Sequence, residues 1–161
     1  KFLFFSSLLS LSPYLKAKEL ENTPASFAKF KPIIAAVQEH MFPEGSKIPS
    51  AKSMNVSVFL FETISHKTYD KDIRAFVWAG AKELAEREKN FLSLSPTEKE
   101  KALRAYEETG YGSNWLSRIM TVTMEGLFSD PIYGSNVKEG GWKSLNAYGG
   151  FPRPQRRYID V

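Results

Sequence analysis

Apolar residues recur every three or four positions over most of the chain, and this spacing restricts the fold more than any other feature of the sequence. From residue 23 to residue 128 these residues fall on one face of successive segments, as in amphipathic α-helices packed around a core. No stretch of strict apolar–polar alternation is long enough to indicate a β-sheet. We therefore expect an all-α fold, a small domain of about five helices.

Proline and polar residues mark the ends of the first three predicted helices. The first begins after a Thr23-Pro24 start signal and ends near Phe42, because the following proline disfavours helical backbone at that residue. The second runs from about residue 55 to residue 67 and is apolar around most of its circumference, so we expect it to be buried in the middle of the domain. The third runs from about residue 69 to residue 90, and Asp70 is expected to cap it.

The fourth predicted helix has the clearest N-terminal signal. Ser95 suits the N-cap, Pro96 suits the first turn and Glu98 completes a capping box. We expect this helix to end at Gly110. The fifth runs from about Ser113 to residue 128. Its apolar face consists of Trp115, Leu116, Ile119, Met120, Val122, Thr123 and Leu127.

The composition is that of an ordinary globular domain. The 161 residues are 42% hydrophobic and 25% charged, and the net charge of +4 is spread along a chain in which Lys and Arg are mixed with Glu. Because no basic stripe appears, we expect no nucleic-acid partner. Arg153, Arg156 and Arg157 do form a cluster, and such a group is either solvated or contacts an acidic partner or lipid head groups.

Few residues have the chemistry of a catalytic or cofactor site. The chain contains no cysteine, which excludes disulfides, thiolate nucleophiles and iron–sulfur ligation. Its two histidines, His40 and His66, fall on separate predicted helices without carboxylates at metal-ligand spacing. No glycine-rich nucleotide motif is present, and the many glutamates are expected on solvated helix faces. We expect no catalytic, cofactor-binding or metal site in this chain.

The beginning of the sequence differs in character from the rest. Residues 1–17, KFLFFSSLLSLSPYLKA, have the size of a signal-peptide hydrophobic region and are too short to span a bilayer as a helix. The abrupt change to KAKELENTP at Lys16 favours a targeting segment, and the alternative is an amphipathic first helix of the domain. We therefore expect a signal-like segment at 1–17, a helical body at 18–128, and a loop and tail at 129–161 that belong to the same domain.

The segment from Ser129 to Pro154, SDPIYGSNVKEGGWKSLNAYGGFPRP, is rich in glycine, proline and aromatic residues and has no helical period. Asp130 and Pro131 suit a turn, and Gly134 lets the chain reverse. A loop this long and aromatic is expected to lie back on the helices, with some aromatic side chains exposed. These side chains either bury against a partner protein, as aromatic anchors do in interface cores, or close the domain's own core.

Three motifs in this region resemble the C-terminal signature of the gluconate 2-dehydrogenase small-subunit family. They are GLFSDPIYGSN at 126–136, GWK at 141–143 and GFP at 150–152. Earlier segments and the apolar N-terminus resemble the family as well, so the resemblance covers most of the chain. Ser135 stands where the family usually has a second glycine, and positive φ at that position would strain a serine. The link between the last two motifs is also longer than in the family.

The resemblance implies a non-catalytic small subunit of a membrane-associated, flavin-dependent dehydrogenase. In such complexes a large subunit of the glucose–methanol–choline oxidoreductase type holds FAD, and a multihaem cytochrome c subunit passes electrons to the quinone pool. The small subunit has no redox centre, and it escorts the folded large subunit through twin-arginine-type export. The resemblance therefore implies a periplasmic location at a bacterial inner membrane, reached only through partners. The substrate belongs to the large subunit.

The resemblance also implies which residues contact the large subunit. They are Asp130, Pro131, Tyr133, Gly134, Asn136, Trp142, Lys143, Phe151 and Pro152. The alternative function is a stand-alone periplasmic helical binding protein or chaperone that works without an enzyme complex. A catalytic role for the chain itself is disfavoured, because the sequence offers no catalytic set.

Overall fold

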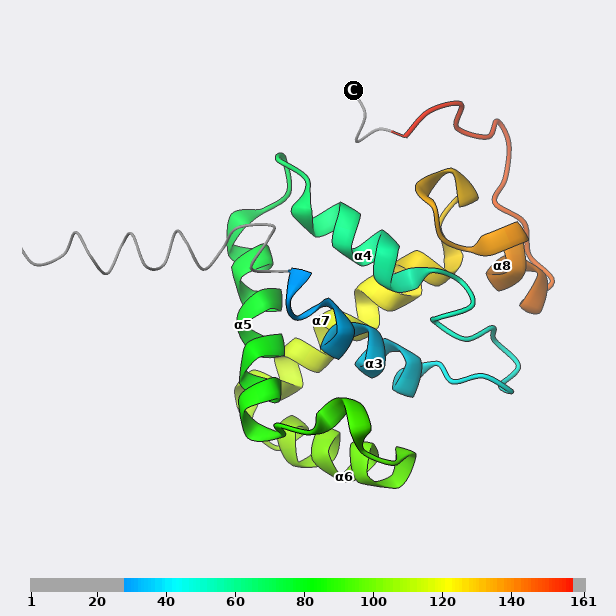
Figure 1. The fold of residues 1–161 in the computed structure, drawn as a ribbon. Helices are drawn as coiled ribbons and strands as arrows, with labels where there is room; N and C mark the ends of the chain where they lie inside the picture. The colour runs from blue at the N-terminus through cyan, green and yellow to red at the C-terminus, as the bar shows by residue number, and fades with distance from the viewer. Residues whose placement is uncertain (1–27, 158–161) are drawn as a thin grey trace, which may run out of the picture.

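The computed structural model describes residues 28–157, which form six α-helices, three 3₁₀ turns and no strand (Figure 1). The prediction of an all-α fold is confirmed. The predicted signal-like segment lies outside the described residues. The elements are α3 (Lys31–Met41), α4 (Val56–Ser65), α5 (Lys71–Arg87), η1 (Phe91–Ser93), α6 (Pro96–Glu107), α7 (Gly110–Phe128), η2 (Pro131–Tyr133), η3 (Val137–Glu139) and α8 (Gly140–Ser144).

Helix α7 is the central element of the described chain. It has 19 residues and contacts α3, α4, α5 and α6. Figure 1 shows it running from the end of the molecule that carries α5 and α6 toward α8. Trp115 is fully buried in the core and donates its indole N–H to the Val77 carbonyl at 2.9 Å, which fixes α7 against α5. The predicted apolar face of α7 is buried as expected, except that Met120 is only partly covered.

The first predicted helix does not run without a break. Residues 29–30 form a turn and α3 begins at Lys31. The expectation of a continuous helix is wrong because Pro32 has no N–H to donate, and its ring would clash with the carbonyl group four residues earlier. The other end agrees with the prediction, since α3 ends at Met41. The predicted start at residues 23–24 lies outside the described residues.

The predicted start of α6 is confirmed, whereas the predicted boundary between α6 and α7 is wrong. Ser95 forms the expected capping box with Glu98, whose carboxylate accepts the Ser95 N–H at 2.8 Å. The next boundary differs, because the Thr109 hydroxyl accepts the N–H of residue 112 at 2.8 Å and caps α7. Helix α7 therefore begins at Gly110, the residue at which we expected α6 to end. The threonine cap outweighs the preference of glycine for helix ends.

Helix α4 lies beside α7 and is not enclosed by other helices (Figure 1). Its buried residues form one stripe of Val56, Leu60 and Ile64, whereas Phe59 and Phe61 are only partly covered. The expectation that this helix is buried in the middle is wrong, because α3 and α7 cover only the side that faces them. Two aromatic residues of α4 therefore reach the surface.

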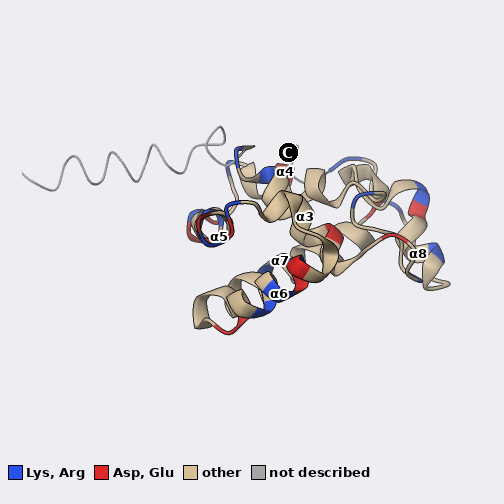
Figure 2. Ribbon diagram, turned by 60° about the horizontal axis from the view of Figure 1, so that its bottom comes forward, with Lys and Arg blue, Asp and Glu red and all other residues tan. Residues whose placement is uncertain are grey.

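Lys and Arg are mixed with Asp and Glu along the helices, as the view in Figure 2 shows. Glu83 pairs with Arg87 at 2.9 Å, one helical turn apart in α5. Such exposed pairs contribute little to stability but agree with the predicted solvated faces. The predicted cap of α5 is also present, since Asp70 Oδ1 accepts N–H groups from residues 72 and 73 at 2.8 and 3.0 Å.

A second, smaller group of buried residues lies at the end of α7 near α8. Its members come from the α3–α4 connection, the first residue of α4 and the last turn of α7, and Val137 of the segment after α7 packs against them. The segment that follows α7 is therefore part of the domain's own packing. The buried members are Ala51, Met54, Val56 and Leu127.

Candidate partner-binding surface

A tight turn follows α7 and starts the glycine-rich segment. Asp130 Oδ1 accepts the N–H of Ile132 at 3.0 Å and so caps η2. Pro131 occupies the first position of η2, and Gly134 follows it with a left-handed φ of 83°. The partly buried Tyr133 lies between them. The turn roles predicted for the aspartate, the proline and the glycine are confirmed.

Asn136 is a fully buried polar residue of the segment. Its side chain donates to the Ser129 carbonyl at 2.8 Å and accepts the N–H of Gly141 at 2.8 Å. It adopts a left-handed φ of 49°, which asparagine tolerates better than most residues. Because every polar atom of a fully buried amide is costly to leave unpaired, these two bonds tie the first turn of the segment to α8.

Helix α8 lies directly against the last turn of α7. A Cβ atom at Gly141 would collide with the carbonyl oxygen of Leu127, so a glycine is required at this position. The neighbouring Trp142 is buried and donates its indole N–H to the Phe128 carbonyl at 2.7 Å. This bond satisfies one of the last carbonyl groups of α7, which have no partner within the helix. Trp142 therefore holds α8 on α7.

Arg153 closes the segment from its C-terminal side. Its Nε atom lies 2.7 Å from Asp130 Oδ2 and its Nη1 atom lies 3.3 Å from Glu139 Oε1. The guanidinium carbon also lies 4.5 Å from the centre of the Trp142 ring system, within the range of a cation–π contact. One side chain thus connects η2, η3 and α8.

The three C-terminal arginines have different surroundings. Arg153 pairs within the segment, as just described, and Arg157 Nη1 lies 3.0 Å from Glu62 Oε2 on α4. Arg156 is exposed. We expected this cluster to be solvated or to contact a partner, and two of its members instead form ion pairs within the chain.

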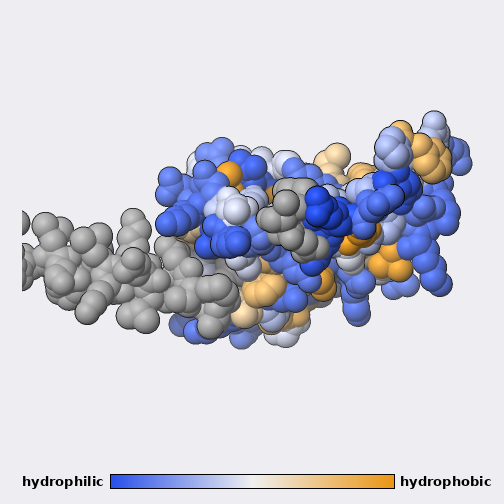
Figure 3. Space-filling view, turned by 90° about the horizontal axis from the view of Figure 1, so that it is seen from above, coloured by the Kyte–Doolittle hydropathy of each residue, from blue (hydrophilic) through white to orange (hydrophobic). Residues whose placement is uncertain are grey.

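Beyond α8 the chain presents large apolar side chains to solvent. Tyr148 is 77% exposed and Phe151 is 85% exposed, and their ring centres lie 6.4 Å apart. Leu145, which is 49% exposed, precedes them. Figure 3 shows hydrophobic side chains at the end of the molecule that carries α8 in Figure 1. Neighbouring exposed apolar side chains of this kind mark interaction surfaces more often than single ones do.

The structure separates the nine residues that the sequence assigned to the partner interface. Asn136 and Trp142 are buried within the chain itself. The other seven reach the surface fully or in part. The aromatic residues therefore divide between the two roles that the sequence left open, because Trp142 completes the chain's own packing and Phe151 does not. The seven are Asp130, Pro131, Tyr133, Gly134, Lys143, Phe151 and Pro152.

Two residues of this surface, Leu145 and Tyr148, were not singled out from the sequence, and Arg153 was noted only as part of a basic cluster. Leu145 and Tyr148 carry a signal that was available, since both are large apolar residues within the aromatic segment. No local sequence signal indicates that Arg153 pairs with Asp130, which lies 23 positions earlier in the chain. Ser135 does not adopt positive φ, and its buried hydroxyl lies 2.8 Å from Ser129 Oγ. The serine in place of the family's glycine therefore introduces no backbone strain.

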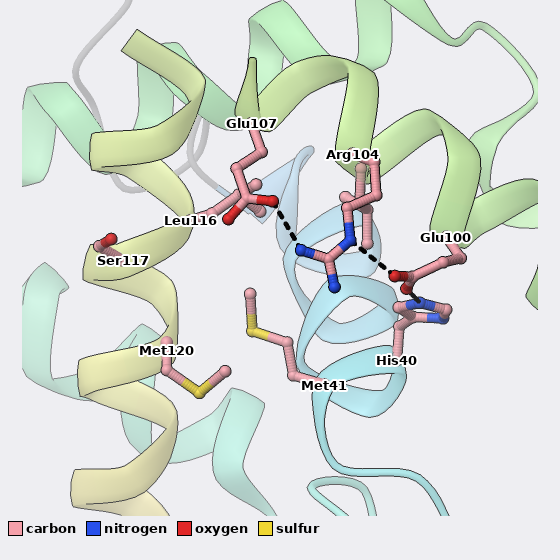
Figure 4. Close-up of a pocket in the computed structure, with 9 residues that line it drawn as sticks. His40, Met41, Glu100, Arg104, Glu107, Leu116, Ser117 and Met120 are labelled. Carbon is pink, nitrogen blue, oxygen red and sulfur yellow. Dashed lines mark hydrogen bonds and ion pairs between the residues drawn. The ribbon is translucent and has the colours of Figure 1, made fainter. Parts of the chain in front are cut away.

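A charged groove of about 400 Å³ lies between α3, α6 and α7 (Figure 4). His40 Nε2 lies 2.7 Å from Glu100 Oε2, and Arg104 contacts Glu100 and Glu107 at 2.8 Å each. Hydrogen bonds from His40 and then from Arg104 lower the pKa of Glu100. Apolar residues complete the groove. They are Met41, Leu103, Leu116 and Met120.

The charged side chains of this groove pair with one another. Ser117 also lines the groove, but Figure 4 shows its hydroxyl on the side of α7 that faces away from His40. The two side chains therefore do not form a nucleophile–base pair. Within residues 28–157 no three His, Cys, Asp or Glu side chains lie close enough together to hold a metal ion, and no helix there is long and apolar enough to cross a membrane.

Fold and surface together define a small helical protein with a glycine-rich aromatic segment folded onto its last long helix. The model of the family described as gluconate 2-dehydrogenase subunit 3 matches residues 29–150, and the chain belongs to this family. The match covers the helical core and most of the segment, and it confirms the resemblance noted in the sequence. No curated protein and no solved structure matches the chain. Membership supports a small accessory subunit of that dehydrogenase.

Proposed function

We propose that this chain is a non-catalytic subunit that binds the FAD-containing large subunit of a periplasmic dehydrogenase and accompanies it through twin-arginine-type export. Family membership supports the accessory role. The proposal further includes a multihaem cytochrome c subunit as the membrane link, so that FAD and haem c are held by the partners. The complex would then lie at the outer face of a bacterial inner membrane.

The observation that carries the proposal is the neighbouring pair of Tyr148 and Phe151, which are 77% and 85% exposed. The segment that presents them is held by the Trp142 hydrogen bond and by the ion pair between Arg153 and Asp130. A segment that is already ordered loses little conformational entropy on binding. Large aromatic side chains on such a segment have the properties of interface anchors.

Replacement of both exposed rings tests this role. The double variant Tyr148→Ala, Phe151→Ala is expected to weaken binding to the purified large subunit by about tenfold or more, because each ring loses its buried contact in the interface. Its melting temperature should stay at the wild-type value, since both side chains are solvated in the free chain. Binding is measured by isothermal titration calorimetry with the FAD-loaded subunit.

Leu92→Ala serves as the matched control, because Leu92 is 52% exposed and lies on η1, outside the aromatic segment. It should bind like the wild type. Wild-type affinity in the double variant would contradict the proposed docking surface.

A further inference from the structure

A groove of about 530 Å³ lies where α4, the end of α7 and η2 meet. In Figure 1 the turns that follow α7 lie beside α4 at this point. The groove is separate from the Tyr148–Phe151 pair and from the charged groove of Figure 4, because it shares no lining residue with either. The residues that line it are Phe59, Thr63, Tyr69, Glu125, Phe128, Ser129 and Tyr133.

Aromatic rings make up most of the groove wall. Four of its seven lining residues are aromatic, and all four are partly covered by the domain. Gly126 allows α4 to lie close to α7 here, because a Cβ atom on it would sit 2.9 Å from Val56 and 3.1 Å from the Phe59 ring. The close crossing sets the Phe59 ring of α4 against the last turns of α7, so that both helices line the groove.

A single carboxylate stands among these rings. Glu125 is the only charged residue that lines the groove. It is exposed, and its side chain makes no hydrogen bond or ion pair within residues 28–157. The other polar groups besides the tyrosines are the neutral hydroxyls of Thr63 and Ser129. The groove therefore combines negative charge with aromatic surface.

We infer that this groove binds a basic side chain, an arginine of the large subunit, as a second contact of the complex. Aromatic faces and a carboxylate both attract a cation, and the combination discriminates against neutral and acidic groups. A guanidinium group stacks on rings and pairs with a carboxylate in one geometry, which an ammonium group does less well. The inference rests on the proposed function for the identity of the partner, and on the groove alone for the chemistry of the contact.

The chain's own arginines near this region have other partners. Arg157 pairs with Glu62 on α4, and Arg153 pairs with Asp130 and Glu139. Neither of these guanidinium groups pairs with Glu125.

The chemistry of the groove is tested without the partner by titrating the full isotope-labelled chain with N-acetyl-arginine amide. N-acetyl-citrulline amide is the matched probe, since it has the same shape and no charge. Backbone NMR resonances of Glu125, Phe128 and Tyr133 should shift with the arginine probe and stay in place with the citrulline probe. Glu125→Gln should weaken the response to the arginine probe at least about fivefold, whereas Glu108→Gln, at the exposed end of α6, should not.

Equal shifts with both probes, no shift at all, or an unchanged response in Glu125→Gln would each overturn the inference.

The affinity of the chain for the large subunit provides an independent test of the same contact. Glu125→Arg should lower affinity for the large subunit at least about tenfold, because it sets like charges against each other. If that variant binds like the wild type, the groove is not a contact although the subunit assignment stands. If the wild type itself binds no flavoprotein, the proposed function fails, and the probe titration still decides whether the groove recognises arginine.

Discussion

Trp142 shows how single residues determine the form of the C-terminal segment. Its indole N–H reaches the Phe128 carbonyl, and the Arg153 guanidinium lies over its ring system. Gly149 passes so close to the indole that a Cβ there would collide with it. The ring is thus enclosed by its own chain on several sides. We infer that Trp142 stabilises the segment that carries Tyr148 and Phe151, and that its own ring does not contact the partner protein.

Trp142→Ala should therefore destabilise the isolated chain. Removal of a buried tryptophan leaves a cavity and an unpaired carbonyl, and a loss of about 3 kcal/mol in the free energy of unfolding is expected. Urea unfolding followed by circular dichroism measures it. Trp142→Phe keeps one aromatic ring but removes the indole N–H and part of the buried bicyclic ring, so it should cost about 2 kcal/mol, less than the alanine change. A Trp142→Ala variant as stable as the wild type would show that the ring belongs to an interface and not to the domain.

Residue chemistry explains which parts of this surface could be predicted from sequence. The roles of Asp130, Pro131 and Gly134 follow from local turn preferences, and the structure confirms them. The pairing of Arg153 with Asp130 joins positions 23 apart and has no local signature. The burial of Trp142 likewise depends on where α8 meets α7. The sequence alone left open whether the aromatic residues of the segment from Ser129 to Pro154 pack against the domain or face solvent.

Helix ends were predicted well where the signal is local. The caps at Asp70 and Ser95 are present, because an N-cap and the N–H groups that it binds lie within three residues of one another. Two predicted helix boundaries were wrong, and each error has a physical cause in a single residue. Pro32 breaks a helix that apolar spacing alone would continue, and Thr109 starts α7 earlier than its apolar face suggests. Helix α4 is covered on one side. This arrangement depends on tertiary packing, and the distribution of apolar residues around α4 does not indicate it.

One contact between α3 and α6, the His40–Glu100 pair, is electrostatic, so its contribution depends on pH. His40 and then Arg104 lower the pKa of Glu100 from its ordinary value of 4.5 by hydrogen bonding. A carboxylate whose pKa is lower in the folded state contributes stability above its unfolded-state pKa and loses it as the pH falls through the folded-state value. This contribution should therefore be present at neutral pH and disappear in acid, below pH 4.5.

Glu100→Gln tests the sign of this effect. The variant should be less stable than the wild type at pH 7, and the difference should shrink as the pH falls below 4.5 and the wild-type carboxylate takes up a proton. Unfolding midpoints in urea across this pH range provide the comparison. Glu108→Gln, which removes an exposed glutamate from the end of α6, is expected to follow the wild type throughout. A constant difference between Glu100→Gln and the wild type would show that the loss is steric and not electrostatic.

The whole molecule has a packed helical body at one end and the aromatic segment at the other. The larger core surrounds Trp115, and the smaller one joins the α3–α4 connection to the end of α7. Because the smaller core and the buried part of the segment share residues such as Val137, the surface that carries Tyr148 and Phe151 is connected to the body through packed side chains. Exposed apolar groups and a rigid support are thus combined at one end of the chain.

Purification of the tagged chain from its own host, with analysis of what accompanies it, tests the accessory-subunit proposal most directly. A tag on a flexible linker at the C-terminus, extraction of the periplasmic and membrane fractions, flavin absorbance and mass spectrometry together give the composition. Recovery of a roughly equimolar FAD-containing large subunit is the predicted result. Recovery of a stable chain alone, without flavin, would contradict the proposal and favour a stand-alone helical binding protein.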